Sequence, residues 1–114
     1  MKSPEPVEPV TALVVLTTLD SEADARALVR SLIDERVIAC GTLLGGGRSI
    51  YRWEGEIKEE EEVVVLLKTD SSKWNDLAAQ VRQRHPYEVP ELLAIPVDRG
   101  LESYLAWLSA EVRA

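Results

Sequence analysis

The hydrophobic and polar positions of the chain fall into blocks that predict four strands and three helices. Short apolar, β-branched runs are typical of strands, and apolar residues at every third or fourth position are typical of amphipathic helices. The predicted strands are residues 11–18, residues 37–44, the returning arm of a hairpin within residues 49–69, and residues 91–97; the predicted helices are residues 21–36, 70–85 and 101–112. The order β-α-β-β-α-β-α predicts an α+β fold of the ferredoxin-like, split β-α-β type, with a C-terminal helix added.

The segment 49–69 is predicted to form one unusually long β-hairpin. Side chains alternate along a strand, so Tyr51 and Trp53 share one face of it. Glu54-Gly55 supplies the turn, because Gly accepts a positive φ without a steric penalty. A hairpin of this length would extend beyond a domain of 114 residues. We therefore expect it to contact another subunit.

Three of the predicted strands are apolar at consecutive positions, namely residues 13–16, 63–67 and 92–95. A sheet covered on only one face alternates apolar with polar residues, whereas a continuous apolar run indicates burial on both faces. Two helices cover one face of a four-stranded sheet, and the third helix could cover part of the other. A partner copy of the chain is the simpler cover for the remainder, which predicts a homo-oligomer.

Length and charge narrow the class of protein. The 114 residues fit one domain, predicted to span residues 11–114, after a disordered lead-in at residues 1–10 that contains three prolines and no apolar signal-peptide core. No apolar run approaches the roughly 20 residues needed to cross a bilayer, so no membrane partner is expected. The net charge of −7 argues against nucleic acid as a partner. We expect a cytoplasmic protein.

The chain has one cysteine, Cys40, and one histidine, His85. Cys40 lies in an apolar strand, where a free cysteine is typically a small buried hydrophobe. His85 could bind Cu(II) or another divalent cation with help from Glu88 and Glu91, or it could simply end a helix as a polar residue. No nucleophile–base pair is evident, and we expect no enzymatic activity.

The hairpin and the strands beside it contain further candidate groups. A lysine at the end of an apolar strand, Lys68, needs a partner, and Glu59 or Glu91 could supply a carboxylate. The glutamate block at residues 59–62 is expected to be a solvated face, because alternating strand side chains cannot all converge on one ion. The glycines at residues 45–47 are interpreted as a flexible bend that interrupts the strand.

Several motifs occur together in one order and spacing. They are Ala39-Cys40, SIYRWEG at residues 49–55, LKT at residues 67–69, HPYEVPEL at residues 85–92 and YLAWL at residues 104–108. In this combination the chain resembles the CutA family of divalent-cation tolerance proteins from about residue 14 to its end. The resemblance implies a ferredoxin-like subunit in a tight homotrimer whose long hairpins reach neighbouring subunits. It also implies a link to copper and other divalent metals, without an established enzymatic reaction.

The resemblance also implies where binding would occur. Positions that match Tyr51, Trp53, Glu59, Lys68 and Tyr87 gather near the clefts between subunits in trimers of this family. Metal-binding members carry a cysteine where this chain has Thr17, and some carry a histidine where it has Arg84. Metal binding is therefore expected to be weak if present, and no cation is expected to be required for folding. The alternative is a trimeric sensor or scaffold, analogous to PII signal proteins, that binds a small effector in the intersubunit cleft.

Overall fold

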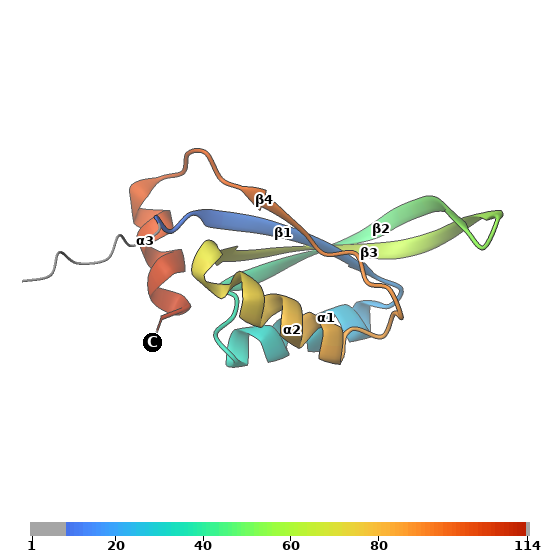
Figure 1. The fold of residues 1–114 in the computed structure, drawn as a ribbon, viewed down its shortest axis with the longest axis horizontal. Helices are drawn as coiled ribbons and strands as arrows, with labels where there is room; N and C mark the ends of the chain where they lie inside the picture. Colours follow the sequence, from blue (N-terminus) through green and yellow to red (C-terminus); the bar gives the residue numbers. More distant parts are fainter. Residues whose placement is uncertain (1–8, 114) are drawn as a thin grey trace, which may run out of the picture.

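The computed structural model describes residues 9–113 and has a four-stranded antiparallel sheet with three α-helices (Figure 1). This result confirms the predicted α+β class and the order of elements. The predicted lead-in, residues 1–10, lies outside the described residues except for Pro9 and Val10, which have no regular secondary structure. The elements are β1 Ala12–Leu19, α1 Glu22–Asp34, β2 Cys40–Trp53, β3 Glu56–Asp70, a 3₁₀ turn Ser71–Lys73, α2 Trp74–Arg84, β4 Leu93–Pro96 and α3 Glu102–Glu111.

The strands lie in the order β2-β3-β1-β4, with the two longest strands joined as the predicted hairpin. Glu54 and Gly55 form the turn, both with positive φ, at 49° and 81°. This pair of left-handed residues matches the right-handed twist of the flanking strands. The distal half of the hairpin extends well beyond the rest of the molecule (Figure 1).

The glycine segment does not interrupt the strand, contrary to the sequence interpretation. β2 runs continuously from Cys40 to Trp53, and the pairing with β3 shifts register only between Leu44 and Gly47. Gly46 takes a φ of +78°, which a residue with a side chain rarely adopts. The segment is therefore a β-bulge, a local irregularity that re-aims the outer half of the hairpin without ending the strand.

The helix boundaries follow the predicted signals. The Ser21 hydroxyl accepts a hydrogen bond from the backbone N–H of Asp24 at 3.0 Å, which caps the start of α1. α2 ends at Arg84, directly before His85 and Pro86, because proline disfavours helical geometry in the residue that precedes it. The position of His85 at the end of α2 brings it toward the strand end of β1.

The two faces of the sheet are both apolar, but only one is fully covered. Val15 and Leu67, paired across β1 and β3, point toward α1 and α2 and are fully buried. The opposite face, which we call the open face, carries a cross-strand row of Leu16, Leu66 and Leu93. Leu93 is 56% exposed, and two further aliphatic side chains of this face, Ile95 and Leu44, are 52% and 49% exposed.

α3 packs against one end of the open face. Its Leu108, together with Val112 just beyond the helix, forms a small buried cluster with Ala39. The hydroxyl of Tyr104 on α3 lies 3.6 Å from Cys40 Sγ, and Cys40 is partly exposed, not buried as expected. An ion pair at 2.6 Å joins Arg113 to the buried Asp70 and fixes the C-terminal segment to the sheet. The middle of the open face remains uncovered.

Candidate functional site

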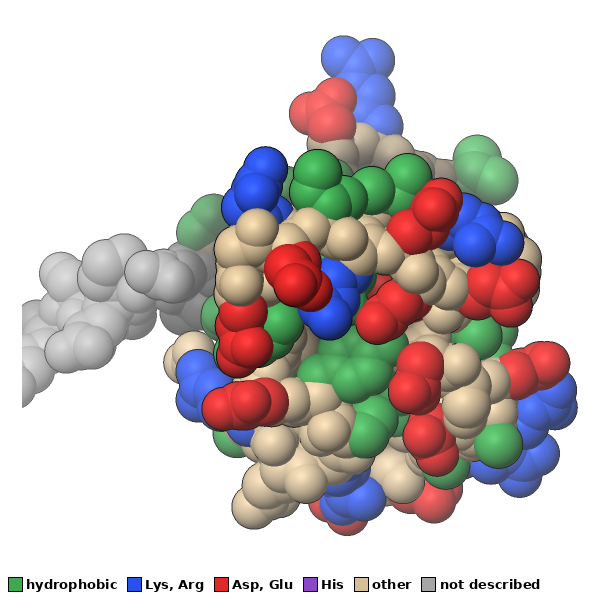
Figure 2. Space-filling view, turned by 90° about the vertical axis from the view of Figure 1, so that its right-hand side faces the viewer, with side chains coloured by type: hydrophobic (Ala, Val, Ile, Leu, Met, Phe, Trp, Pro, Cys, Tyr) green, Lys and Arg blue, Asp and Glu red, His purple; other side chains and the backbone are tan. Residues whose placement is uncertain are grey.

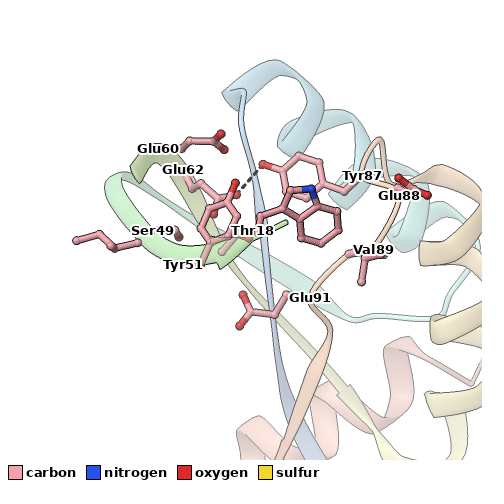
Figure 3. A pocket seen from close by; sticks show the side chains of 12 residues that line it. Thr18, Ser49, Tyr51, Glu60, Glu62, Tyr87, Glu88, Val89 and Glu91 are labelled. Carbon is pink, nitrogen blue, oxygen red and sulfur yellow. Dashed lines mark hydrogen bonds between the residues drawn. The ribbon is translucent and has the colours of Figure 1, made fainter. Parts of the chain in front are cut away.

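A pocket of about 690 Å³ lies between the stem of the hairpin and the segment that connects α2 to β4. Figure 3 shows Ser49 and Tyr51 contributed by the hairpin, and Tyr87, Glu88, Val89 and Glu91 contributed by the connecting segment. Its lining residues are Thr18, Ser49, Ile50, Tyr51, Trp53, Glu60, Glu62, Tyr87, Glu88, Val89, Pro90 and Glu91. A volume of this size is typical of sites for small molecules.

A partly buried hydrogen bond joins the two sides of this pocket. The Tyr87 hydroxyl donates to Glu62 Oε2 at 2.6 Å, and Glu62 is only 8% exposed. Burial opposes ionisation of this carboxyl group, but hydrogen bonds from Ser49, Tyr87 and Thr18 outweigh burial and hold its pKa below the ordinary value. Burial and the neighbouring carboxylate raise the pKa of Tyr87, so its hydroxyl stays protonated. Glu62 is thus a buried structural anion, whereas the sequence predicted a solvated side chain.

His85 is buried and is not among the residues that line the pocket. Its Nδ1 accepts a hydrogen bond from the backbone N–H of Tyr87 at 3.1 Å. Its other ring nitrogen, Nε2, therefore carries the proton and donates to the carbonyl oxygen of Thr18 at 2.9 Å. Both nitrogens are engaged within the chain. Through these two hydrogen bonds His85 links the end of α2 to the end of β1 and positions the segment that connects α2 to β4.

The predicted cleft residues divide into two groups. Tyr51, Trp53 and Tyr87 all line the pocket. Glu59 does not, because it pairs with Ile50 in the hairpin and, by strand alternation, points to the face opposite Tyr51.

Lys68 also lies outside the pocket. It sits on the open face, and its Nζ donates to Thr42 Oγ1 at 2.6 Å. Within the described residues Lys68 is therefore paired with a hydroxyl group and not with the expected carboxylate.

The three predicted metal ligands do not all lie in the pocket. Glu88 and Glu91 line the pocket, whereas His85 is not among its lining residues. Among residues 9–113, no group of three or more His, Cys, Asp or Glu side chains is placed to hold one metal ion. The carboxylates of the pocket are spread along its walls and do not converge on a point.

The pocket is nonetheless strongly acidic. Its lining includes Glu60, Glu62, Glu88 and Glu91 and, over the part of the chain that the structure describes, no Lys, Arg or His. Figure 2, which faces the hairpin end of the molecule, shows acidic side chains bordering an apolar area. Glu60 and Glu62 were not predicted as pocket residues. Strand alternation alone separates Glu60 and Glu62 from Glu59 and Glu61 by face. Assigning the first pair to the face of Tyr51 also requires the register in which β2 pairs with β3.

Comparisons with known proteins agree with the fold and the motifs. The family model described as CutA1 divalent ion tolerance protein matches residues 13–111. The Divalent-cation tolerance protein CutA of Pectobacterium atrosepticum is 45% identical over 102 residues, which cover 90% of this chain and 93% of that protein.

Solved structures give the same result. A divalent cation tolerance protein from Thermus thermophilus has a TM-score of 0.85 at 41% identity, covering 88% of this chain and 97% of that one. A protein described as the periplasmic divalent cation tolerance protein CutA from Archaeoglobus fulgidus has a TM-score of 0.87 at 28% identity, covering 90% and 99%. No α-helix within residues 9–113 is long and apolar enough to cross a membrane.

Proposed function

The chain belongs to the CutA1 divalent ion tolerance family, and on that premise we propose that it is a cytoplasmic homotrimer that binds divalent cations weakly. Copper is the first candidate cation. Its matched relatives are named as tolerance proteins and not as enzymes, and we propose no catalytic activity for the chain. The observation that carries the proposal is the acidic pocket beside the long hairpin.

Exposed carboxylate side chains that line this pocket support cation binding. Glu88 and Glu91 lie three residues apart on the segment between α2 and β4 and are exposed. Carboxylate oxygens bind hard divalent cations, whereas Cu(II) gains most from imidazole or thiolate ligands. His85 could join them only by giving up one of its two hydrogen bonds, with the Tyr87 N–H through Nδ1 or with the Thr18 carbonyl oxygen through Nε2. That loss offsets part of the gain from a metal–nitrogen bond, which explains why we propose weak binding.

The exposed apolar side chains of the open face support assembly. Leu93 and Ile95 on β4 and Leu44 on β2 are about half exposed, although they lie in line with half-buried aliphatic residues of the central strands. An uncovered apolar sheet face is a typical protein–protein contact surface. The projecting hairpin offers a second contact that reaches beyond one subunit. Three copies arranged around an axis would bury the apolar side chains of the open face and would bring the pocket beside the hairpin to the cleft between subunits.

Titration of the full chain with Cu(II), followed by native mass spectrometry, tests the metal proposal. We expect copper to bind to the trimer, and the variant Glu88→Gln/Glu91→Gln to lose it. The matched control Glu59→Gln/Glu61→Gln removes the same charge from the opposite face of the hairpin and should retain copper. Loss in both variants, or in neither, would reject Glu88 and Glu91 as ligands. If His85→Ala binds copper like the unmodified chain, the histidine is not a ligand.

A second candidate function is a trimeric sensor or scaffold that binds a small effector beside the hairpin. The aromatic side chains in the pocket favour it, because rings provide a contact surface that a simple metal site does not need.

A further inference from the structure

The pocket is lined by aromatic side chains and by carboxylates, a combination that is unusual for a simple metal-ion site. Tyr51, Trp53 and Tyr87 provide aromatic rings, and Val89 and Pro90 add apolar contact area. Rings of this kind attract organic cations through the negative face of the π system, with Trp the strongest. The remaining walls carry carboxylates. The lining therefore favours a ligand that is both cationic and partly apolar.

The carboxylates lie on different sides of the pocket. Glu60 comes from β3, whereas Glu88 and Glu91 come from the segment after α2, and Figure 3 shows Glu60 and Glu88 on opposite sides. Within residues 9–113 no three acidic or metal-ligating side chains share one ion site. A ligand that meets carboxylates on both sides needs at least two positive charges separated by several bonds. A compact divalent metal ion does not satisfy that requirement.

Glu60, Glu88 and Glu91 are exposed, and Glu60 lies within hydrogen-bond reach of the Tyr51 hydroxyl. Glu62 is occupied by the Tyr87 hydroxyl, which holds the ring of Tyr87 in the pocket wall. None of the ion pairs found within residues 9–113 involves Glu60, Glu88 or Glu91. Lys58 is the nearest cation along the hairpin on the face of Tyr51, where it is the cross-strand partner of that residue, but it does not line the pocket.

We propose that this pocket binds a linear polyamine, an alkyl chain with two or more protonated amines. The terminal ammonium groups would pair with Glu60 on one side and with Glu88 or Glu91 on the other. The methylene groups between them would lie on Tyr51, Trp53 and Val89. This inference gives a chemical class to the effector of the second candidate function, and it does not depend on metal binding.

Isothermal titration calorimetry of the full, assembled chain with spermidine tests this proposal, with EDTA present to exclude divalent metals. We expect saturable binding of one spermidine per chain that weakens as salt is raised, because the contacts are largely ionic. The variant Glu60→Gln/Glu88→Gln should bind at least about tenfold more weakly. The matched control Glu59→Gln/Glu61→Gln, which has the same net charge, should bind like the unmodified chain.

A second variant separates the aromatic contribution from charge. Trp53→Leu keeps every carboxylate, and we expect it to weaken spermidine binding several-fold while its circular dichroism spectrum and its oligomeric state in native mass spectra stay unchanged. Equal weakening in Glu60→Gln/Glu88→Gln and Glu59→Gln/Glu61→Gln would mean diffuse attraction to an acidic protein and would overturn the proposal. Absence of saturable binding would also overturn it.

The metal and polyamine proposals fail separately. Copper binding without spermidine binding would leave the metal proposal standing and reject this one. Spermidine binding in EDTA, with no copper uptake in native mass spectra, would do the reverse.

Discussion

The two faces of the sheet carry similar apolar side chains but differ in what covers them. On the helix-covered face, Val15, Val65 and Leu67 are fully buried by α1 and α2. On the open face, Leu93 and Ile95 remain about half exposed within one chain. The contacts of the single chain therefore account for the apolar side chains of one face, and the proposed assembly would account for those of the other. The same substitution should act on folding at one face and on association at the other.

The largest effect is expected from Leu67→Ala on the covered face. Leu67 is fully buried in the main core, and removing its side chain leaves a cavity beneath α1 and α2. Substitutions of this kind cost about 2–5 kcal/mol in the free energy of unfolding. Urea denaturation measures the loss. A cost near zero would contradict the assignment of this face to the core.

On the open face, Leu93→Asp should act on assembly. A buried, unpaired carboxylate in an apolar interface costs several kcal/mol. We therefore expect the dissociation constant of the proposed trimer to rise at least about a hundredfold. Sedimentation velocity over a dilution series measures this shift. Leu101→Asp, at a leucine that is 79% exposed before α3, is the control and should assemble normally. If both variants remain trimeric at every dilution, β4 is not part of the interface.

Two threonines on the covered side give opposite predictions. The hydroxyl of Thr17 is fully buried and has no hydrogen-bond partner within residues 9–113. Thr69, also fully buried, donates its hydroxyl to the carbonyl oxygen of Val37 at 2.7 Å. Thr17→Val should therefore stabilise the fold by about 1 kcal/mol, whereas Thr69→Val should destabilise it by about 1–2 kcal/mol. Thermal unfolding of both variants provides the comparison, and a loss of stability in Thr17→Val would indicate a hidden partner.

The smallest effect is expected at the acidic end of the open face. The pKa of Glu62 is lowered in the folded state, so its ionisation stabilises the fold above the ordinary carboxyl pKa. That contribution is lost as the pH falls through the lower, folded-state pKa. Tyr87→Phe removes the 2.6 Å hydrogen bond and should cost about 1 kcal/mol at pH 7, with a smaller cost in strong acid. A cost that stays the same from pH 7 into strong acid, below the folded-state pKa of Glu62, would show that the charge of Glu62 is not involved.

Periodicity and local signals predicted the fold well. The Ser21 cap, the Glu54-Gly55 turn and the end of α2 before Pro86 are all present, because each depends on residues close together in sequence. The order of the elements was also predicted. The glycine segment was misinterpreted, because a bulge depends on the pairing of β2 with β3 and not on glycine content alone.

The site was less predictable than the fold. The grouping of Tyr51 and Trp53 followed from strand alternation, and Tyr87 was associated with them only through the family resemblance. The placement of Glu62 opposite Tyr87 depends on a contact between residues 25 positions apart, which no local pattern encodes. His85 was proposed as a ligand from its chemistry, and its two hydrogen bonds became visible only in three dimensions.

Native mass spectrometry of the full chain at low micromolar concentration tests the central claim most directly, namely that the open face is an assembly surface. We predict a single dominant species with three times the mass of the chain, which persists on tenfold dilution. A monomer at every concentration would contradict the claim, because the half-exposed aliphatic row of β2 and β4 would then face solvent in the native protein.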